Sequence, residues 1–432
     1  MLFGLSFDYY LLIVWFSSAY RNSGQNIYPA YTRRISRITE KKIVLNEKNT
    51  LPLSGTRFIA SLMIFIVHFP VQGQNWLSQF TNKWLFVNTW FFILSGFVLT
   101  QKYFLRFNQL NSVNLFNFYI ARLAKIYPLY LCLFFIFWLK WGAPNIDLWL
   151  YVCGLQAWTF DVNKVIAIDS PAWFVSAIIF LYLLFPFLIY LSHRLKIAES
   201  FEKIVMTAVF FVSILYFLAN YANLTGEAWL PPSQPKSVYL WMYFFPIARI
   251  PDFSLGMIAA IFCFYFEKKR NFPVLFWSSM TYGACFLILF FMVISKYFYS
   301  AYFMDVAYLV PFFFLIIGIV HSPQAKISRL LSTPALLFLG ELSYAFYLLH
   351  MPFTIGIVGS YPFTINFALY ILIILIIICS ALGFYELIEK PCQKFILKYF
   401  IFPNGLWCFR EKFYSFLQKK RLQDYGNNPD II

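Results

Sequence analysis

LPLSGTRFIASLMIFIVHFP, residues 51–70, is the stretch that decides the fold. It is apolar and long enough to enter a bilayer, yet it carries Arg57 near its start and His68 near its end. The two residues are eleven positions apart, close to three helical turns and roughly 16 Å of rise, so one helix face holds both. Ionisable side chains inside a span are costly and indicate a functional site. A structural alternative is a snorkelling arginine with a histidine that is hydrogen-bonded inside the bundle.

The composition of the whole chain agrees with a membrane protein. The chain has 432 residues, of which 61% are hydrophobic and 12% charged. Apolar runs of about twenty residues, the length that crosses a bilayer, recur to the end of the sequence. We therefore predict an all-α fold, a polytopic membrane bundle of about ten transmembrane helices. The expected spans are 57–72, 84–104, 126–141, 172–192, 204–222, 238–266, 272–294, 302–321, 336–356 and 364–386.

The distribution of basic residues predicts the orientation of this bundle. Ten spans divide the connecting segments into two alternating sets, which hold 27 and 4 Lys/Arg residues. Basic loops stay in the cytoplasm, so both ends of the ten-span core are expected there, with 223–237 on the far side. The net charge of +16 is spread among short loops and therefore does not indicate a nucleic-acid partner.

Two segments depart from the regular pattern of spans. Residues 146–158 (IDLWLYVCGLQAW) are apolar but too short to cross, which predicts a re-entrant or interfacial segment. The span at 238–266 contains Pro246, Arg249, Pro251 and Asp252, which predicts a helix broken at membrane depth. Such breaks are tolerated where they line a protein cavity or water.

The chain divides into three parts in this interpretation. Residues 1–50 hold an apolar segment and a basic cytoplasmic stretch, 51–396 form the membrane domain, and 397–432 form a basic cytoplasmic tail. The first twenty residues lack the features of a signal peptide, and they fit either an extra span or an interfacial helix. No cysteine pair has CxxC spacing, so we expect neither a metal site nor a disulfide framework.

Several further motifs accompany the opening stretch. They are NTWFFILSGFVLT (88–100) with Ser95, FYIARLAKIYPLY (118–130) with Arg122 and Lys125, PAWFVSAIIFLYLLFPF (171–187) with Trp173, PIARIPDFSLGMIAA (246–260) with Arg249, GELSYAFYLLHMPF (340–353) with Tyr344, Tyr347 and His350, and ELIEKPCQKF (386–395). Ser95-Gly96 is a small pair that allows close helix approach. Glu389 and Lys390 are expected to form a local ion pair.

Together these motifs resemble membrane acyltransferase family three, which includes O-acetyltransferases of lipopolysaccharide O-antigen, peptidoglycan and nodulation factors. The resemblance covers about residues 50–396, and its most specific element is the Arg-x10-His pattern of Arg57 and His68. Lys125 stands where the family has the second arginine of Arg-x-x-Arg. A glutamate that the family often carries early in the span after Trp173 is absent, so its role is missing or has moved.

The resemblance implies transfer of an acyl group, with acetyl common in the family, from cytoplasmic acyl-CoA to a hydroxyl of an extracytoplasmic acceptor such as a cell-envelope glycan. It implies an integral protein of a bacterial inner membrane, in contact with the lipid bilayer. Arg122, Lys125 and Arg57 would bind the CoA phosphates. His68 would act as the base, and His350 would supply a second acid/base group or orient the thioester carbonyl. Arg57 is the third expected catalytic residue. The expected substrate contacts are Ser95, Trp173, Arg249, Tyr344 and Tyr347.

Two other classes of function remain open from the sequence. A transporter or flippase of a lipid-linked sugar would use the broken helix and the basic mouth as a pathway, without a base at His68. A non-catalytic subunit of an envelope assembly would tolerate loss of either histidine. The structural alternatives also remain: Arg122 and Lys125 as topology determinants, and His350 as a core histidine. The identity of the acceptor is not fixed by any motif.

Overall fold

The computed structural model of the chain describes residues 47–69, 86–141, 147–269, 272–298, 300–358 and 367–401. The chain divides into one unit at 1–44 and a compact unit at 45–432, and all the described residues belong to the second. The predicted apolar segment at 1–20, the basic stretch up to residue 46 and the tail beyond residue 401 lie outside the described residues.

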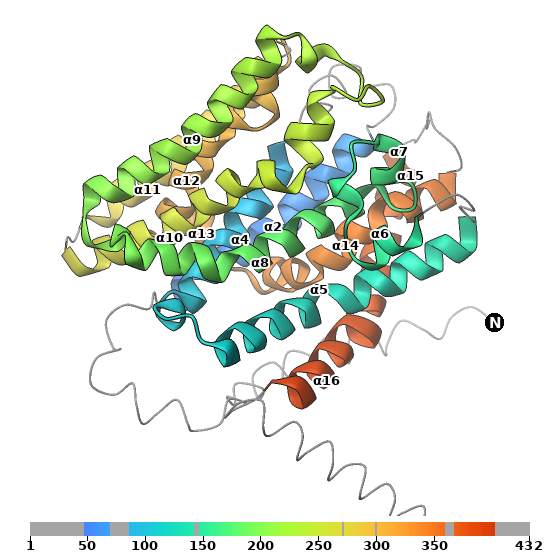
Figure 1. The fold of residues 1–432 in the computed structure, drawn as a ribbon, viewed down its shortest axis with the longest axis horizontal. Coiled ribbons are helices and arrows are strands. Elements are labelled where there is room, and N and C mark those ends of the chain that lie inside the picture. The colour runs from blue at the N-terminus through green and yellow to red at the C-terminus, as the bar shows by residue number, and fades with distance from the viewer. Residues whose placement is uncertain are drawn as a thin grey trace, which may run out of the picture. The chain divides into compact units, whose positions relative to one another are not determined.

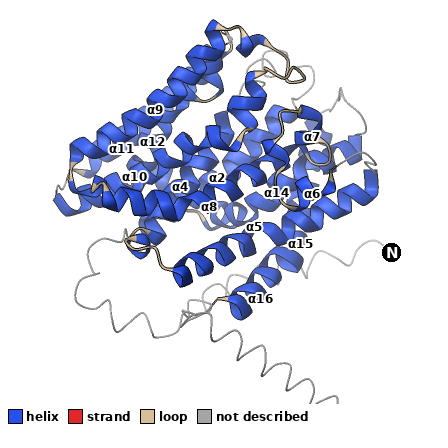
Figure 2. Ribbon diagram, in the orientation of Figure 1, coloured by secondary structure: helices blue, strands red, loops and turns tan. Residues whose placement is uncertain are grey.

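The described residues form helices and contain no strand (Figure 2). Backbone N–H and C=O groups in lipid must be satisfied within the segment that carries them, and this requirement explains why the apolar runs are helical. The long helices are α2 (Glu47–His68), α4 (Val87–Tyr103), α5 (Ser112–Trp141), α8 (Trp173–Arg194), α9 (Phe201–Leu224), α10 (Ile250–Lys269), α11 (Val274–Ser295), α12 (Val306–His321), α14 (Pro334–Val358) and α15 (Phe367–Phe384).

Nine of the described helical segments are long and apolar enough to cross a membrane. The remaining expected span is α4, whose 17 residues rise roughly 26 Å, near the lower limit for a crossing. The predicted all-α membrane bundle is therefore confirmed. We call the end of the bundle with Glu47, Tyr103 and Arg194 the basic end, and the end with His68 and Trp173 the opposite end.

Helices α2, α4 and α10 run through the middle of the bundle (Figure 1). The close approach of α4 and α10 depends on two glycines. A Cβ at Gly96 would lie 2.0 Å from the carbonyl oxygen of Phe253, and one at Gly256 would lie 1.8 Å from that of Ile93. The small pair at Ser95-Gly96 thus does allow close helix packing, as the sequence predicted. Gly340 plays the same part between α14 and α2, where it faces the Ser54 carbonyl.

The predicted break in the span at 238–266 is confirmed. A π-helical segment, η8 (Tyr239–Phe244), ends at Phe245, whose backbone is extended. A 3₁₀ turn, η9 (Pro246–Arg249), then leads into α10. The proline at the first position of the turn has no N–H to donate, so it starts a helix easily but cannot continue one. The break brings the guanidinium of Arg249 into the interior.

The apolar segment at 146–158 does not cross the bundle. It forms two short helices, α6 (Leu148–Val152) and η4 (Gln156–Trp158), which are followed by α7 (Val162–Ile166) and η5 (Ser170–Ala172). Gln156 is fully buried and its side-chain amide donates to the carbonyl of Ala172, 2.9 Å away. The segment therefore packs against the start of α8 at the opposite end.

Candidate functional site

Two histidines from helices far apart in the sequence meet inside the bundle. His68 is the last residue of α2 and His350 lies in the second half of α14. His68 Nδ1 lies 3.0 Å from His350 Nε2, and the two rings are stacked with their centroids 5.2 Å apart. Ser61, on the same face of α2, donates to the carbonyl of Ser343, 3.1 Å away, and so helps to set the register of the two helices.

The hydrogen bonds fix the neutral tautomers of both rings. The Nδ1 of His350 bonds to the carbonyl of Tyr347, which is only an acceptor, so Nδ1 carries the proton. His350 Nε2 must then accept from His68 Nδ1–H. In this pairing the proton of His68 is on Nδ1 and its lone pair is on Nε2. His350 therefore orients the His68 ring and selects its Nδ1–H tautomer.

The surroundings of the two rings differ in exposure. His350 is fully buried, whereas His68 is half-buried. The Tyr347 hydroxyl donates to the carbonyl of Pro171 at 3.0 Å and lies 3.5 Å from Asn88 Oδ1, which ties α14 to η5 and to the first turn of α4. His68 is thus the more exposed of the two rings, and His350 is the one enclosed by the bundle.

Two arginines lie together nearer the basic end. Arg57 of α2 and Arg122 of α5 are within electrostatic range of each other and of the Tyr182 hydroxyl, which hydrogen-bonds with Ser95. Among the described residues neither arginine has a carboxylate within ion-pair distance, and Arg122 Nε is buried without a hydrogen-bond partner. The two guanidinium groups therefore lie close together, with Glu341 as an acidic neighbour of Arg57 beyond ion-pair distance.

Lys125 is held differently from the arginines. Its ammonium pairs with Glu389, which is fully buried, while Lys390 pairs with Glu386 at 2.6 Å. The expected Glu389–Lys390 pair is therefore wrong, because the helical turn at 385–389 directs Glu389 towards α5 and leaves Lys390 beside Glu386 one turn earlier. A donor-binding role for Lys125 stays a prediction, with its charge already balanced by Glu389.

The comparison with known families agrees with this arrangement. A family model described as an acyltransferase domain, that of acyltransferase family 3, matches residues 53–386, which is most of the chain. The chain belongs to acyltransferase family 3. No curated protein and no solved structure matches it. The acyltransferase is thus an integral membrane enzyme, since its apolar helices and its family agree.

Arg249 lies in a different environment from the one expected for a substrate contact. Its NH1 group is 2.8 Å from Asp252 and 2.7 Å from Asp305, and NH2 donates to the carbonyl of Met242. All three charged side chains are buried, and Thr89 donates to Asp305 at 2.6 Å. This network ties the broken helix to α12 and α4. Substrate contact by Arg249 stays a prediction, while the geometry gives it a structural role.

The other expected substrate contacts lie on three helices, Trp173 on α8, Tyr344 on α14 and Ser95 on α4. Trp173 is buried against Phe92 and Tyr243, and the Tyr344 hydroxyl donates to the carbonyl of Ile126 at 2.8 Å. Ser95 lies by Tyr182, beside the two arginines. The described residues hold no cluster of His, Cys, Asp and Glu that could bind a metal.

Three residues of the site were not singled out from the sequence. Tyr182 and Asn88 lie inside motifs that were recognised, and their hydroxyl and amide groups in apolar runs were the available signal. Asp169 lies just before α8, is buried, and has one carboxylate oxygen without a hydrogen-bond partner among the described residues. Burial raises the pKa of Asp169 well above its usual range, which favours the protonated form.

Proposed function

We propose that the acyltransferase moves an acyl group, acetyl in the first instance, from acyl-CoA to a hydroxyl of an extracytoplasmic acceptor, a cell-envelope glycan. The observation that carries the proposal is the pairing of His68 with His350, which leaves a lone pair on the more accessible ring. A neutral imidazole is the side chain best suited to take a proton from a hydroxyl near neutral pH.

The donor would enter from the basic end. The phosphates of CoA need cations, and Arg57 and Arg122 supply two guanidinium groups with no carboxylate partner among the described residues. From Arg57 to His68 the helix rises roughly 16 Å. An extended pantetheine arm covers a distance of this order, so the thioester can reach the histidines while the phosphates stay at the arginines.

The chemical step follows from the tautomers of the two histidines. His68 Nε2 takes the proton of the acceptor hydroxyl as its oxygen attacks the thioester carbonyl carbon. The tetrahedral intermediate then expels the CoA thiolate, the C–S bond breaks, and the proton on His68 passes to the leaving sulfur. During the step His350 Nε2 keeps accepting from His68 Nδ1–H. The carbonyl groups at the C-terminal end of α2 also stabilise the imidazolium.

The proposed orientation follows from the charge pattern of the loops. The basic end would face the cytoplasm, where acyl-CoA is made, and the opposite end would face the acceptor. The bacterial inner membrane fits a protein with this orientation and a glycan acceptor.

The experiment that tests the proposal supplies radiolabelled acetyl-CoA to membranes with and without the acyltransferase. We expect label in the envelope glycan fraction only when the protein is present, and release of that label by mild alkali, which cleaves oxygen esters. Equal labelling of the two samples would contradict the proposal. Label-free glycan together with protein-dependent movement of a lipid-linked sugar would favour a flippase instead.

A further inference from the structure

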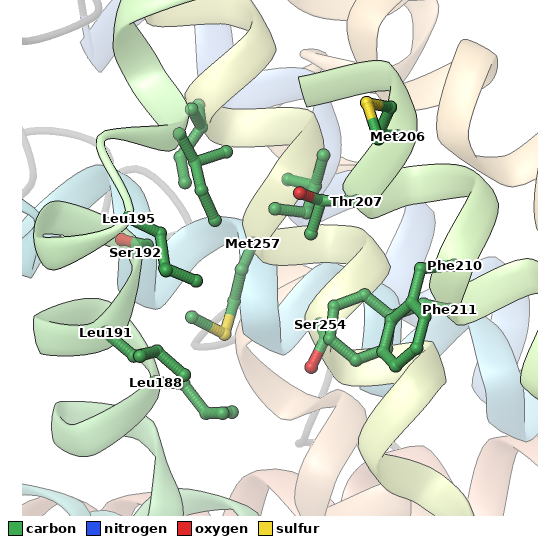
Figure 3. A pocket seen from close by; sticks show the side chains of 13 residues that line it. Leu188, Leu191, Ser192, Leu195, Met206, Thr207, Phe210, Phe211, Ser254 and Met257 are labelled. Carbon is green, nitrogen blue, oxygen red and sulfur yellow. The ribbon is translucent and has the colours of Figure 1, made fainter. Parts of the chain in front are cut away.

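A lipid-facing cavity lies on the side of the bundle, outside the site already described. It has a volume of about 310 Å³ and lies between α8, α9 and α10. Figure 3 shows side chains of α8 on one side, those of α9 on the other, and Met257 of α10 between them. Its walls are almost entirely apolar, and Leu191, Met206 and Phe210 also reach the outer surface of the bundle.

The cavity ends beside a charged loop. Leu195 and Ile197, two of its wall residues, flank Lys196 in sequence, and the carbonyl of Leu195 accepts a hydrogen bond from Lys203 Nζ at 3.0 Å. Arg194 lies one residue before Leu195 and is exposed. The acidic neighbours are Glu202 and Glu199, whose carboxylate is 3.9 Å from Lys196 Nζ. This end of the cavity, its mouth, thus has three cations and two carboxylates nearby, all at the basic end of the bundle.

We propose that this cavity is a binding site for one anionic phospholipid. An acyl chain lies between α8, α9 and α10, and the phosphate contacts Lys203 and Lys196 at the mouth. Basic residues at the ends of grooves between membrane helices are the usual recognition elements for anionic headgroups. The cavity is separate from the acyl-transfer site, because none of the arginines, histidines and other residues named for that site lines it.

The inner wall of the cavity offers a second reason for an occupant. Ser254, Met257, Ile258 and Ile261 of α10 line the cavity and are all less than 4% exposed. Empty space beside a buried wall forfeits dispersion contacts, which an acyl chain restores. A lipid held there would also join α9, which has few buried residues, to the core helix α10.

Native mass spectrometry of the purified full chain tests the proposal, with dioleoyl phosphatidylglycerol and dioleoyl phosphatidylcholine added separately. The tails of the two probes are identical, so a difference between them reports the headgroup. We expect one phosphatidylglycerol to be retained, with at least tenfold preference over phosphatidylcholine. The double variant Lys196→Gln/Lys203→Gln should lose that preference, and Thr207→Trp, which fills the cavity from the half-buried face of α9, should lose the bound lipid.

The matched control is Lys236→Gln/Lys296→Gln, which removes two cations at the opposite end and should leave binding unchanged. Equal retention of the two lipids by the wild type would overturn the proposal, as would unchanged phosphatidylglycerol binding in both site variants. If Thr207→Trp does not fold, a phosphatidylglycerol with a photoreactive group in its tail is crosslinked to the wild type instead. Crosslinks that avoid α8, α9 and α10 would then overturn it.

Discussion

At the scale of single residues, the two histidines have different parts in the proposed mechanism. There His68 takes the proton, and His350 acts through it by accepting its Nδ1–H. We therefore propose His350 as a positioning residue. The same logic separates Arg57 and Arg122, which lack a carboxylate partner among the described residues, from Lys125, which pairs with Glu389.

Replacement of His350 tests its positioning role. His350→Phe removes the acceptor of the His68 Nδ1–H bond, so we expect kcat to fall on the order of 10²- to 10⁴-fold, with KM for acetyl-CoA unchanged. His350→Gln retains an amide oxygen that can accept the bond and should recover part of the loss. Steady-state kinetics on folded protein would measure kcat and KM for both variants. A rise in KM alone, or equal kcat in His350→Phe and His350→Gln, would contradict the positioning role of His350.

Replacement of the arginines tests the donor site. Arg57→Gln and Arg122→Gln should each weaken CoA binding about 10- to 100-fold at low salt, the usual value of a hydrogen bond to a charged group. The loss should shrink at high salt, since the contacts near the membrane surface are screened. Isothermal titration with CoA measures it. Arg106→Gln is the control, because Arg106 is exposed and bonds to Asn114. If Arg57→Gln and Arg122→Gln bound CoA as tightly as the control Arg106→Gln, the donor-binding role of Arg57 and Arg122 would be wrong.

At the scale of elements, the contact between α4 and α10 is the closest in the core. Gly256→Ala would place a Cβ 1.8 Å from the carbonyl oxygen of Ile93, and backbone cannot yield as a flexible side chain can. We expect a loss of about 1–3 kcal/mol in the free energy of unfolding, or failure to fold. Gly283→Ala in α11 meets nothing within 4 Å and should be neutral or slightly stabilising. Thermal unfolding in detergent compares the two variants. Equal midpoints would contradict the prediction and would show that α4 and α10 can move apart to admit the extra methyl group.

The elements also show how far the sequence could predict the structure. The spans, the broken helix and the Arg57–His68 face follow from the apolar runs, the prolines and the helical period, which are local properties. The partners of individual charges do not follow in this way. Asp305 joins Arg249 from 56 residues away, and Glu389 reaches Lys125 rather than its neighbour Lys390. Such pairs depend on how helices pack, and nothing local in the sequence encodes that.

At the scale of the whole molecule, the orientation of the bundle decides which substrate enters from which side. Single cysteines at Gln234 and at Lys326, in a background without the native cysteines, should be labelled differently by a membrane-impermeant maleimide. We expect Gln234 to react in intact cells and Lys326 only after lysis, because basic loops stay in the cytoplasm. The reverse labelling pattern would contradict the predicted orientation and would place the basic end outside the cell.

The acyltransferase as a whole is proposed to work through one base reached from both ends of the bundle. The most direct test is acetyl transfer from radiolabelled acetyl-CoA, normalised to folded protein, in the wild type, His68→Gln and His193→Gln. His193 is a matched control, since it lies at a helix end and bonds to the carbonyl of Phe104 at 2.7 Å. We predict that His68→Gln loses about 10²- to 10⁴-fold in turnover while CoA binding and His193→Gln stay near the wild type. Near-normal turnover in His68→Gln would contradict the account.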